Sequence, residues 1–175
     1  MEQAELQVEH SPRNRMEQAA ISYAAQGLRI LPLIPRGKTP YKGNGVTHAT
    51  TDNPQIVDWF SQEPDINIGI ATGDGLVVLD ADSEEAASVL AGLQPTASVK
   101  TSRGKHFYFL SPEHIKNSVK KLRKDVDVRG QNGYVVAPPS VHPDGTLYEW
   151  DDRNVPIATL PRNIEFLLGS PRLDI

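Results

Sequence analysis

The sequence predicts a mixed α/β fold of the α+β kind. Its first half alternates segments of helical periodicity with short, continuous apolar runs, a pattern typical of helices packed on buried strands. Near residue 95 the pattern changes to short strands separated by turns. With 175 residues, of which 38 % are hydrophobic and 23 % charged, the chain suffices for one domain or two closely packed halves.

Four segments carry the start and stop signals of helices. The first has apolar residues on one face and stops at Gly27, and the second is capped by Asp52. A serine followed by two glutamates opens the third, and the last stops at Gly169. The expected helices are 16–26, the segment after residue 52, 83–93 and 162–168.

Apolar runs bounded by glycine, proline and polar turns indicate the strands. The run 76–79 is the most regular, because it follows a glycine-rich turn and leads directly into Asp80. The other expected strands are 28–34, 66–71, 98–101, 106–110, 126–128, 134–137 and 146–150.

The ends and the composition limit the remaining interpretation. We expect a flexible tail in 1–15, the folded domain in 16–169, and in 170–175 the start of a linker to a C-terminal region. The absence of cysteine excludes disulfides and thiolate metal sites and makes the cytoplasm the simplest location. No apolar run reaches membrane-spanning length, so we expect no membrane partner. The net charge of −4 requires that any nucleic-acid contact come from local basic patches.

The strongest chemical signal is an aspartate pair at the end of the 76–79 strand. Asp80 and Asp82 are two residues apart, so in an extended chain they project from the same face. Adjacent carboxylates repel unless a cation lies between them, and Mg²⁺ takes oxygen ligands of this kind. The alternative is that Asp82 belongs to the start of the following helix and Asp80 is merely exposed.

A glycine turn between two predicted strands is a candidate triphosphate site. It brings the Ser102 hydroxyl, the backbone around Gly104 and the Lys105 cation together just before a histidine. The alternation of the next strand lets His106 face the site while Phe107 and Phe109 face the other way. A hairpin tip with solvated charges is the competing interpretation.

A second acidic pair, Asp125 and Asp127, lies on a predicted strand with Arg129 in phase. A third carboxylate beside Asp80 would complete a two-metal site. The spacing alone leaves open which member of the pair supplies it, and an exposed edge strand is the alternative.

Two further segments carry weaker signals. Prolines before Ser140 fix the backbone and present Ser140 and His142 on one side. Lys38 lies in a loop rich in glycine and proline, without the spacing of a P-loop, and could meet a phosphate.

A run of cations precedes the second acidic pair. It is the most obvious local footprint for a phosphate backbone, although such runs are usually solvated surface. The run comprises Lys116, Lys120, Lys121, Arg123 and Lys124.

The order of these motifs resembles the bifunctional primase/polymerase N-terminal domain of the archaeo-eukaryotic primase superfamily. The series reads GKTP, VVLDAD, SRGKHFYF and VDVRGQNGYVVAPPSVHPDGTLYEW, and the resemblance covers about residues 16–166. Such domains occur in replication proteins of plasmids, phages and other mobile elements. The resemblance implies an N-terminal α/β unit fused to an RRM-like mixed-sheet unit, with a catalytic cleft between them.

The resemblance also implies roles for particular residues. The metal ligands would be Asp80, Asp82 and Asp127, with His106 as a further catalytic residue. The nucleotide-binding residues would be Lys38, Ser102, Gly104, Lys105, His106, Arg129, Ser140 and His142. The zinc stem that some members insert near the third motif is absent, because the chain has no cysteine.

The resemblance therefore implies a DNA primase and polymerase that performs template-directed nucleotidyl transfer with two Mg²⁺ or Mn²⁺ ions. Its partners would be nucleoside triphosphates, a single-stranded or primed DNA template, and a C-terminal helicase or accessory region of the full-length protein. Two alternatives stay open. The same carboxylates suit a metal-dependent nuclease or phosphohydrolase, and an RRM-like sheet also suits a non-catalytic nucleic-acid-binding module, which would stack bases on strand aromatics.

Overall fold

The computed structural model describes residues 14–169, without the side chain of Lys121. Of the predicted tail only Asn14 and Arg15 are described, and they belong to the first helix, whose N-cap is the Asn14 side chain. The predicted linker 170–175 lies outside the described residues.

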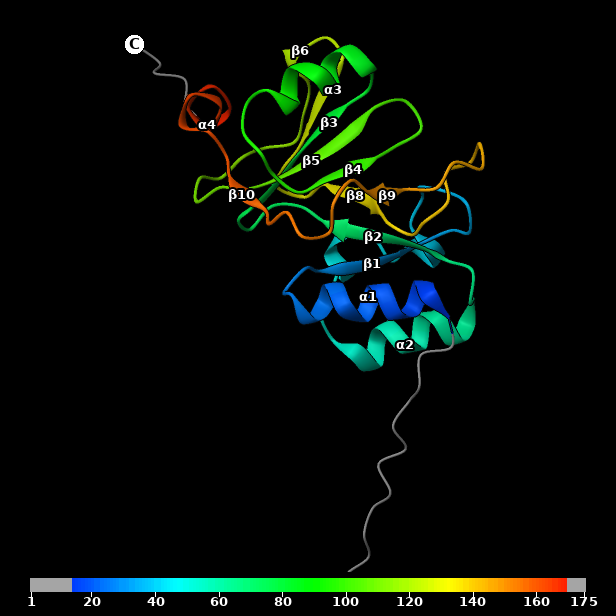
Figure 1. Ribbon diagram of the computed structural model, residues 1–175. Coiled ribbons are helices and arrows are strands. Elements are labelled where there is room, and N and C mark those ends of the chain that lie inside the picture. Colours follow the sequence, from blue (N-terminus) through cyan, green and yellow to red (C-terminus); the bar gives the residue numbers. More distant parts are fainter. Residues whose placement is uncertain (1–13, 170–175) are drawn as a thin grey trace, which may run out of the picture.

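The helices and strands alternate in the first half of the chain and become strand-rich in the second (Figure 1). The helices are α1 (Arg15–Ala25), α2 (Asn53–Gln62), α3 (Glu84–Ala91) and α4 (Arg162–Gly169), with 3-10 turns at Tyr41–Gly43 and Val46–His48. The strands are β1 (Ile30–Leu33), β2 (Asn67–Ala71), β3 (Leu76–Ala81), β4 (Ser98–Lys100), β5 (Lys105–Leu110), β6 (Ser118–Arg123), β7 (Val126–Arg129), β8 (Tyr134–Ala137), β9 (Glu149–Trp150) and β10 (Ala158–Thr159).

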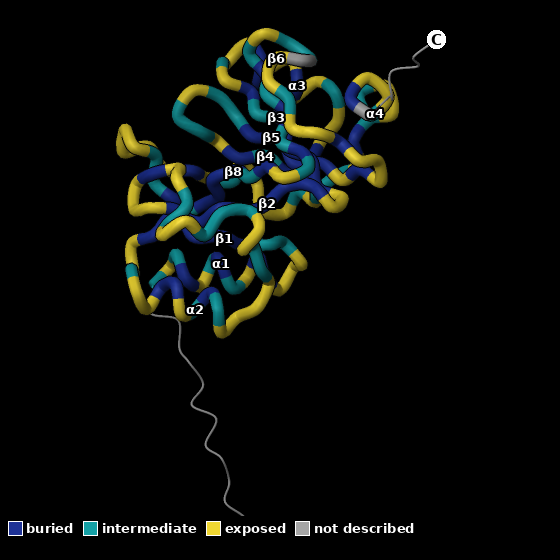
Figure 2. The backbone as a smooth tube through the Cα atoms, turned by 180° about the vertical axis from the view of Figure 1, so that it is seen from behind, coloured by how far each residue is buried: buried dark blue, intermediate teal, exposed yellow. Residues whose placement is uncertain are grey.

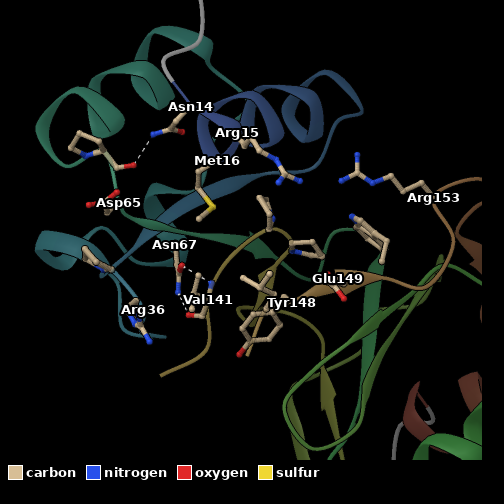
Figure 3. A pocket seen from close by; sticks show the side chains of 16 residues that line it. Asn14, Arg15, Met16, Arg36, Asp65, Asn67, Val141, Tyr148, Glu149 and Arg153 are labelled. Carbon is tan, nitrogen blue, oxygen red and sulfur yellow. Dashed lines mark hydrogen bonds between the residues drawn. The ribbon is translucent and has the colours of Figure 1, made fainter. Parts of the chain in front are cut away.

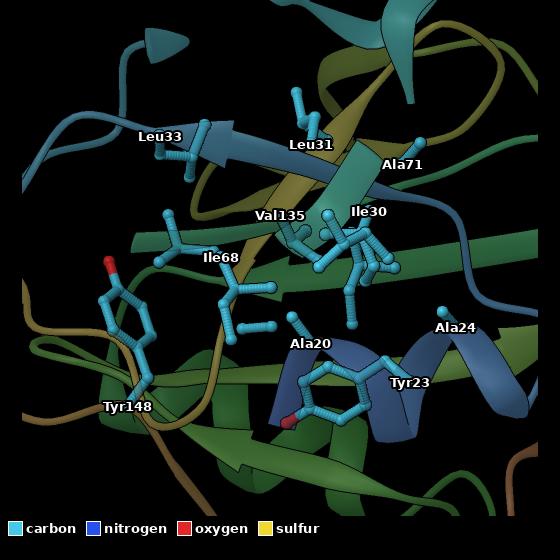
Figure 4. Close-up of a cluster of buried hydrophobic side chains, with 14 of the residues drawn as sticks. Ala20, Tyr23, Ala24, Ile30, Leu31, Leu33, Ile68, Ala71, Val135 and Tyr148 are labelled. Carbon is cyan, nitrogen blue, oxygen red and sulfur yellow. The ribbon is translucent and has the colours of Figure 1, made fainter. Parts of the chain in front are cut away.

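A small antiparallel sheet, in the order β1-β2-β8, packs against α1 and α2. Figure 4 shows Ala20, Tyr23 and Ala24 of α1 beside Ile30 and Ile68 of this sheet. The helix ends where predicted, because Gly27 has φ +84°, a conformation that glycine adopts without steric cost. This layer buries one of two apolar cores.

A larger sheet runs in the order β6-β7-β3-β5-β4-β9, with β10 added in parallel beside β5. Its central strand β3 is antiparallel to both of its neighbours, β5 and β7. One face of these strands packs apolar side chains against α3 in the second core. Those strand side chains are Val77, Leu79, Phe107, Phe109, Val126 and Val128.

The opposite face of the large sheet looks toward the small sheet. Val78 and Tyr108 from this face belong to the same core as α1 and β2. The buried tube segments in Figure 2 accordingly run through both sheets, with exposed residues concentrated in the connecting loops. The polar residues of the site lie on this inner-facing side.

The chain passes between the sheets several times. It leaves the small sheet after β2, returns from β7 to β8, and goes back to the large sheet at β9. The change of sequence pattern near residue 95 therefore is not a structural boundary, because strands on either side of it pair in one sheet.

The mixed α/β class with antiparallel sheets is confirmed, but three strands differ from prediction. The lysine-rich segment 118–123 and the segment 158–159 form strands that were not expected, and the strand expected at 146–150 is reduced to Glu149–Trp150. Pairing with β7, β5 and β4 organises these segments. No helix in residues 14–169 is long and apolar enough to cross a membrane.

Candidate active site

Three polar side chains form a row across the centre of the large sheet. Asp80 on β3 pairs with His106 on β5 and, on its other side, with Asp127 on β7. Alternation places all three on the face opposite α3, because their immediate neighbours in sequence are buried in the α3 core. The strand register thus joins the separate acidic and histidine motifs into one site.

Arg129, two residues after Asp127, completes this row. Its Nη2 lies 3.6 Å from Asp80 Oδ2 and 3.5 Å from Asp127 Oδ2. Like charges directly opposite each other on neighbouring strands are destabilising, and a shared cation reduces that repulsion. The two carboxylates are therefore placed where positive charge stabilises them.

The row opens into a cavity of about 220 Å³ between the two sheets. The large sheet supplies Asp80, His106 and Arg129, while β8 and the loop after β1 supply the other side. The Tyr134 hydroxyl donates to the Lys38 backbone carbonyl over 2.8 Å, which fixes that loop beside the cavity. The remaining lining residues are Asn117, Asn132, Gly133, Val135, Val136 and Tyr148.

His106 is buried at the base of this cavity. Its Nε2 lies 3.5 Å from Asp80 Oδ1, and its Nδ1 has no hydrogen-bond partner among the described residues. Burial lowers the pKa of His106, although the negative charge of Asp80 opposes the shift. The ring is therefore neutral at pH 7 and keeps an unused polar atom for a further contact.

Asp82 departs from its predicted position. The strand β3 ends at Ala81, and the Asp82 side chain is 61 % exposed, with Arg103 Nη1 at 3.7 Å. Only Asp80 of this pair joins the row. Asp82 nevertheless lies close to the row, just past the end of β3, because its backbone N–H donates to the Asp125 carbonyl oxygen over 2.9 Å.

Asp125, the other member of the second acidic pair, is largely shielded from solvent and held by two partners. Its carboxylate accepts a hydrogen bond from the Ser83 hydroxyl at 2.7 Å and one from Arg123 Nε at 2.7 Å. The Arg123 hydrogen bond, followed by that of Ser83, lowers the pKa of Asp125 to about 2. Asp125 thus ties the start of α3 to the end of β6, whereas Asp127 faces the cavity row.

The turn before β5 is shaped by packing. A Cβ at Gly104 would overlap the carbonyl oxygen of Ala81, so only glycine lets this turn approach the end of β3. Lys105 is out of phase with His106, and its Nζ lies 2.9 Å from Asp151 Oδ2. Strand alternation directs Lys105 to the face opposite His106, so its side chain lies away from the row in this structure, and its triphosphate contact stays a prediction.

Ser102 and His142, predicted separately, are joined by a residue that sequence reasoning missed. The Ser102 hydroxyl donates to Asp144, and His142 Nδ1 lies 2.9 Å from Asp144 Oδ1. The Ser102 hydrogen bond, followed by one from the Thr146 backbone, holds the pKa of Asp144 well below its usual range. This cluster anchors the loop after β8 to the turn before β5.

Tyr148 connects that cluster to the row. Its ring lies between His106 and His142, with centroid distances of 6.1 Å to each. Burial, followed by the negative charges of Asp80 and Asp144, raises the pKa of Tyr148 to about 12. Tyr148 therefore stays neutral and supplies an aromatic wall to the cavity.

Ser140 does not face the cavity. Its side chain is completely buried, and its hydroxyl accepts a hydrogen bond from the Ile68 backbone N–H at 2.8 Å. The hydroxyl connects β2 to the loop after β8 in this structure, and the nucleotide contact of Ser140 stays a prediction.

The basic run lies beside the site, but its members differ. Lys116, Lys120 and Lys124 are exposed, whereas Arg123 is held by Asp125 and by Glu85 at 3.1 Å. The Lys120 backbone N–H donates to Asp127 Oδ1 over 3.3 Å at a positive φ of 58°. Arg123 is thus unavailable for a phosphate, and β6 approaches the row through its backbone.

Several lining residues carried no usable sequence signal. Asn117, Asn132, Tyr134 and Tyr148 reach the cavity only because β6, β8 and the loop before β9 fold against the row. The spacing of Asp144 from His142 was a detectable turn pattern, but its contact with Ser102 spans 42 residues.

The oxygen donors fit a hard divalent cation. Within residues 14–169, no three His, Cys, Asp or Glu side chains form a ready-made metal group. Asp80 and Asp127 offer adjacent, partly exposed carboxylates, and Asp82 is held only by its contact with exposed Arg103.

Adjacent carboxylates, an arginine and a buried histidine at a cavity place this protein in the class of mixed α/β proteins with a charged site between two sheets. Within that class, residues 20–163 match the family of bifunctional DNA primase/polymerase N-terminal domains, known as Prim-Pol. This chain belongs to that family, which implies primase and polymerase activity in general and nucleotides and DNA as substrates. No curated protein matches the chain.

Proposed function

We propose that this domain performs template-directed nucleotidyl transfer as a DNA primase and DNA polymerase of a plasmid, phage or other mobile element. The observation that carries the proposal is the row His106–Asp80–Asp127, with Arg129 bridging the two carboxylates beside a cavity between the sheets. Family membership supplies the reaction class.

Asp80, Asp127 and Asp82 would hold two Mg²⁺ or Mn²⁺ ions. Bound there, the ions would make a primer 3′-hydroxyl a better nucleophile and stabilise the charge of the departing pyrophosphate. The protein provides little covalent chemistry in such a reaction, so its residues act by positioning and by charge.

The other residues of the cavity would hold the incoming nucleotide. Arg129 offers a guanidinium for bidentate contact with phosphate, and Lys38 borders the same cavity from the loop after β1. His106 would line the nucleotide site with its ring, and Tyr148 links it to the cluster of Ser102, Asp144 and His142.

The exposed lysines of β6 and its flanks would contact the template. Lys116, Lys120 and Lys124 lie beside the row, and Lys121 belongs to the same run. A C-terminal helicase or accessory region in the full-length protein would place this domain in a replication protein.

The structure bears differently on the two alternative functions, a non-catalytic binding module and a nuclease. A binding module that stacks bases on the sheet would need exposed strand aromatics, but Phe107 and Phe109 are buried against α3. A nuclease would use the same carboxylates, so the products of the reaction distinguish it from a polymerase.

Extension of a labelled primer on a DNA template with Mn²⁺ tests the proposal. Incorporation of deoxynucleotides in template order, dependent on Asp80 and Asp127, is the expected result. Release of mononucleotides without any triphosphate requirement would instead establish the nuclease.

A further inference from the structure

A second, larger hollow lies next to the candidate active site. This groove of about 930 Å³ runs between the start of α1, the loop after β1 and the segment from β8 to the end of β9 (Figure 3). Three arginines line it: Arg15 at the start of α1, Arg36 after β1, and Arg153 after β9. We call this hollow the arginine groove.

The charges of the arginine groove are not neutralised internally. Within residues 14–169, none of its three guanidinium groups forms an ion pair or a hydrogen bond. In Figure 3, Arg15 and Arg153 point toward each other from opposite walls. The lining also contains Asp65 and Glu149, so it holds three cations against two carboxylates in a chain of net charge −4. Unpaired guanidinium groups that face each other favour an anionic ligand between them.

The walls between these arginines are apolar and rigid. Leu147 is 50 % exposed, and Pro138 and Pro139 form part of the lining. Trp150 is held in place, because its indole N–H donates to the Tyr23 hydroxyl at 2.9 Å and its ring packs on Tyr108. Alternating cations and fixed apolar surfaces match a strand of unpaired nucleotides, whose phosphates and base faces are both exposed. A duplex hides its base faces and would leave the apolar walls unused.

The arginine groove adjoins the candidate active site. Tyr148 lines both the groove and the cavity at Asp80. The loop after β1 also borders both, because Arg36 lines the groove and Lys38 lines the cavity. A strand bound in the groove would therefore lie next to the cavity.

We propose that the arginine groove binds single-stranded DNA through Arg15, Arg36 and Arg153 and guides it to the cavity at Asp80. The groove lies on the β9 side of the large sheet, whereas the lysine run lies at the opposite, β6 edge. This inference adds a binding site to the proposed function, and the strand's role as template rests on that function. Binding itself is independent of catalysis.

The test compares two triple variants that remove equal charge. The groove variant carries Arg15→Gln, Arg36→Gln and Arg153→Gln. The control carries Lys42→Gln, Lys100→Gln and Arg162→Gln, which lie outside both hollows. Fluorescence anisotropy with a labelled oligothymidylate, without metal or nucleotide, measures affinity over a range of salt concentrations.

The groove variant should bind the oligothymidylate at least about tenfold more weakly than the control. Its slope of log K against log salt should fall by about 2, since each single-strand phosphate that is no longer neutralised removes about 0.7. A blunt duplex should be bound almost equally by both variants. Leu147→Ser should weaken single-strand binding without changing the slope, because it removes an apolar wall and no charge.

Groove and control variants with the same single-strand affinity and slope would overturn the inference. So would an equal loss for single strand and duplex, which would reflect net charge alone. Primer extension by the wild-type protein reports separately on the proposed function. If extension succeeds while the groove variant binds normally, the groove assignment fails and the function stands. If extension fails while single-strand binding depends on the groove, the groove assignment stands and the proposed function fails.

Discussion

The two acidic pairs of this protein have the same spacing and lie opposite each other, yet their members have different surroundings. Asp80 on β3 faces Asp127 on β7, and one step further Asp82 faces Asp125 across the last backbone contact. Asp80 and Asp127 both contact Arg129 beside the cavity. Of the other two carboxylates, Asp82 is exposed, whereas Asp125 is hydrogen-bonded to Ser83 and Arg123.

This difference arises where the strands end. Within the sheet, the pleat holds two carboxylates on one face at close distance, whatever their mutual repulsion. Beyond the sheet each side chain turns to the nearest partner. When two acidic residues lie at a strand end, the strand register therefore positions the one inside the sheet, whereas local contacts position the one beyond it.

The largest effect should come from the in-register carboxylates. Asp80→Asn or Asp127→Asn should lower primer extension by at least about 10³-fold, because each removes charge needed at the reacting phosphate. The melting temperature without metal should change little, since each variant relieves a like-charge repulsion and also removes an ion pair with Arg129. Extension close to wild type in either variant would separate the row from catalysis.

Asp82→Asn tests the carboxylate that lies outside the sheet. If Asp82 rotates toward the row as a third ligand, the variant should lose activity to a similar degree. Its melting temperature should not fall, because the side chain is exposed and makes a single charged contact. Full activity in Asp82→Asn would confine the acidic site to the two in-register carboxylates.

Asp125→Asn should affect stability and leave extension within about threefold of wild type. The lowered pKa of Asp125, about 2 against 3.8, means that its carboxylate stabilises the fold above about pH 4 and that this contribution is lost as the pH falls through 2. The difference in melting temperature between wild type and Asp125→Asn should therefore be largest at neutral pH and shrink toward pH 2. A larger loss of activity here than in Asp127→Asn would contradict the observed register.

His106→Ala should raise the KM for the incoming nucleotide about tenfold with a smaller change in kcat, because it removes a neutral contact and no charge. His48→Ala, an exposed histidine on another surface, is the matched control. Calorimetric titration of the nucleotide provides the independent check. Unchanged nucleotide affinity in His106→Ala would remove the histidine from the binding site.

The smallest effect should come from the lysine run. Replacing Lys116, Lys120 and Lys124 by Gln should flatten the salt dependence of primed-template binding by about 0.7–0.9 for each phosphate that these lysines neutralise in the wild type. Affinity for a free deoxynucleotide should stay constant. An unaltered slope would show that this edge of the sheet is solvated and that the template is held elsewhere.

The sequence by itself determined the faces of the strands. Strand alternation is local, so His106 could be separated from Phe107 and Phe109, and Asp127 grouped with Arg129, before any contact was known. The same alternation also shows from the sequence that Lys105 and His106 lie on opposite faces of their strand. The order of the motifs indicated the family, and the family match confirms it.

Tertiary structure alone decided which of these residues meet. The pairing of Asp80 with both His106 and Asp127 depends on the register between strands that are distant in the chain. The family resemblance implied that Ser140 contributes to the site, but packing against β2 buries its side chain.

The remaining site residues were beyond sequence reasoning for the same physical reason. Tyr148 reaches the cavity, and Asp144 reaches Ser102, through contacts between segments that neither periodicity nor spacing connects. The surroundings of Asp125 were likewise decided by Ser83 and Arg123, which approach it only once β6, β7 and α3 have packed together. Local periodicity specifies the face on which a side chain lies, whereas its partner across the sheet or cavity depends on long-range packing that only the folded chain establishes.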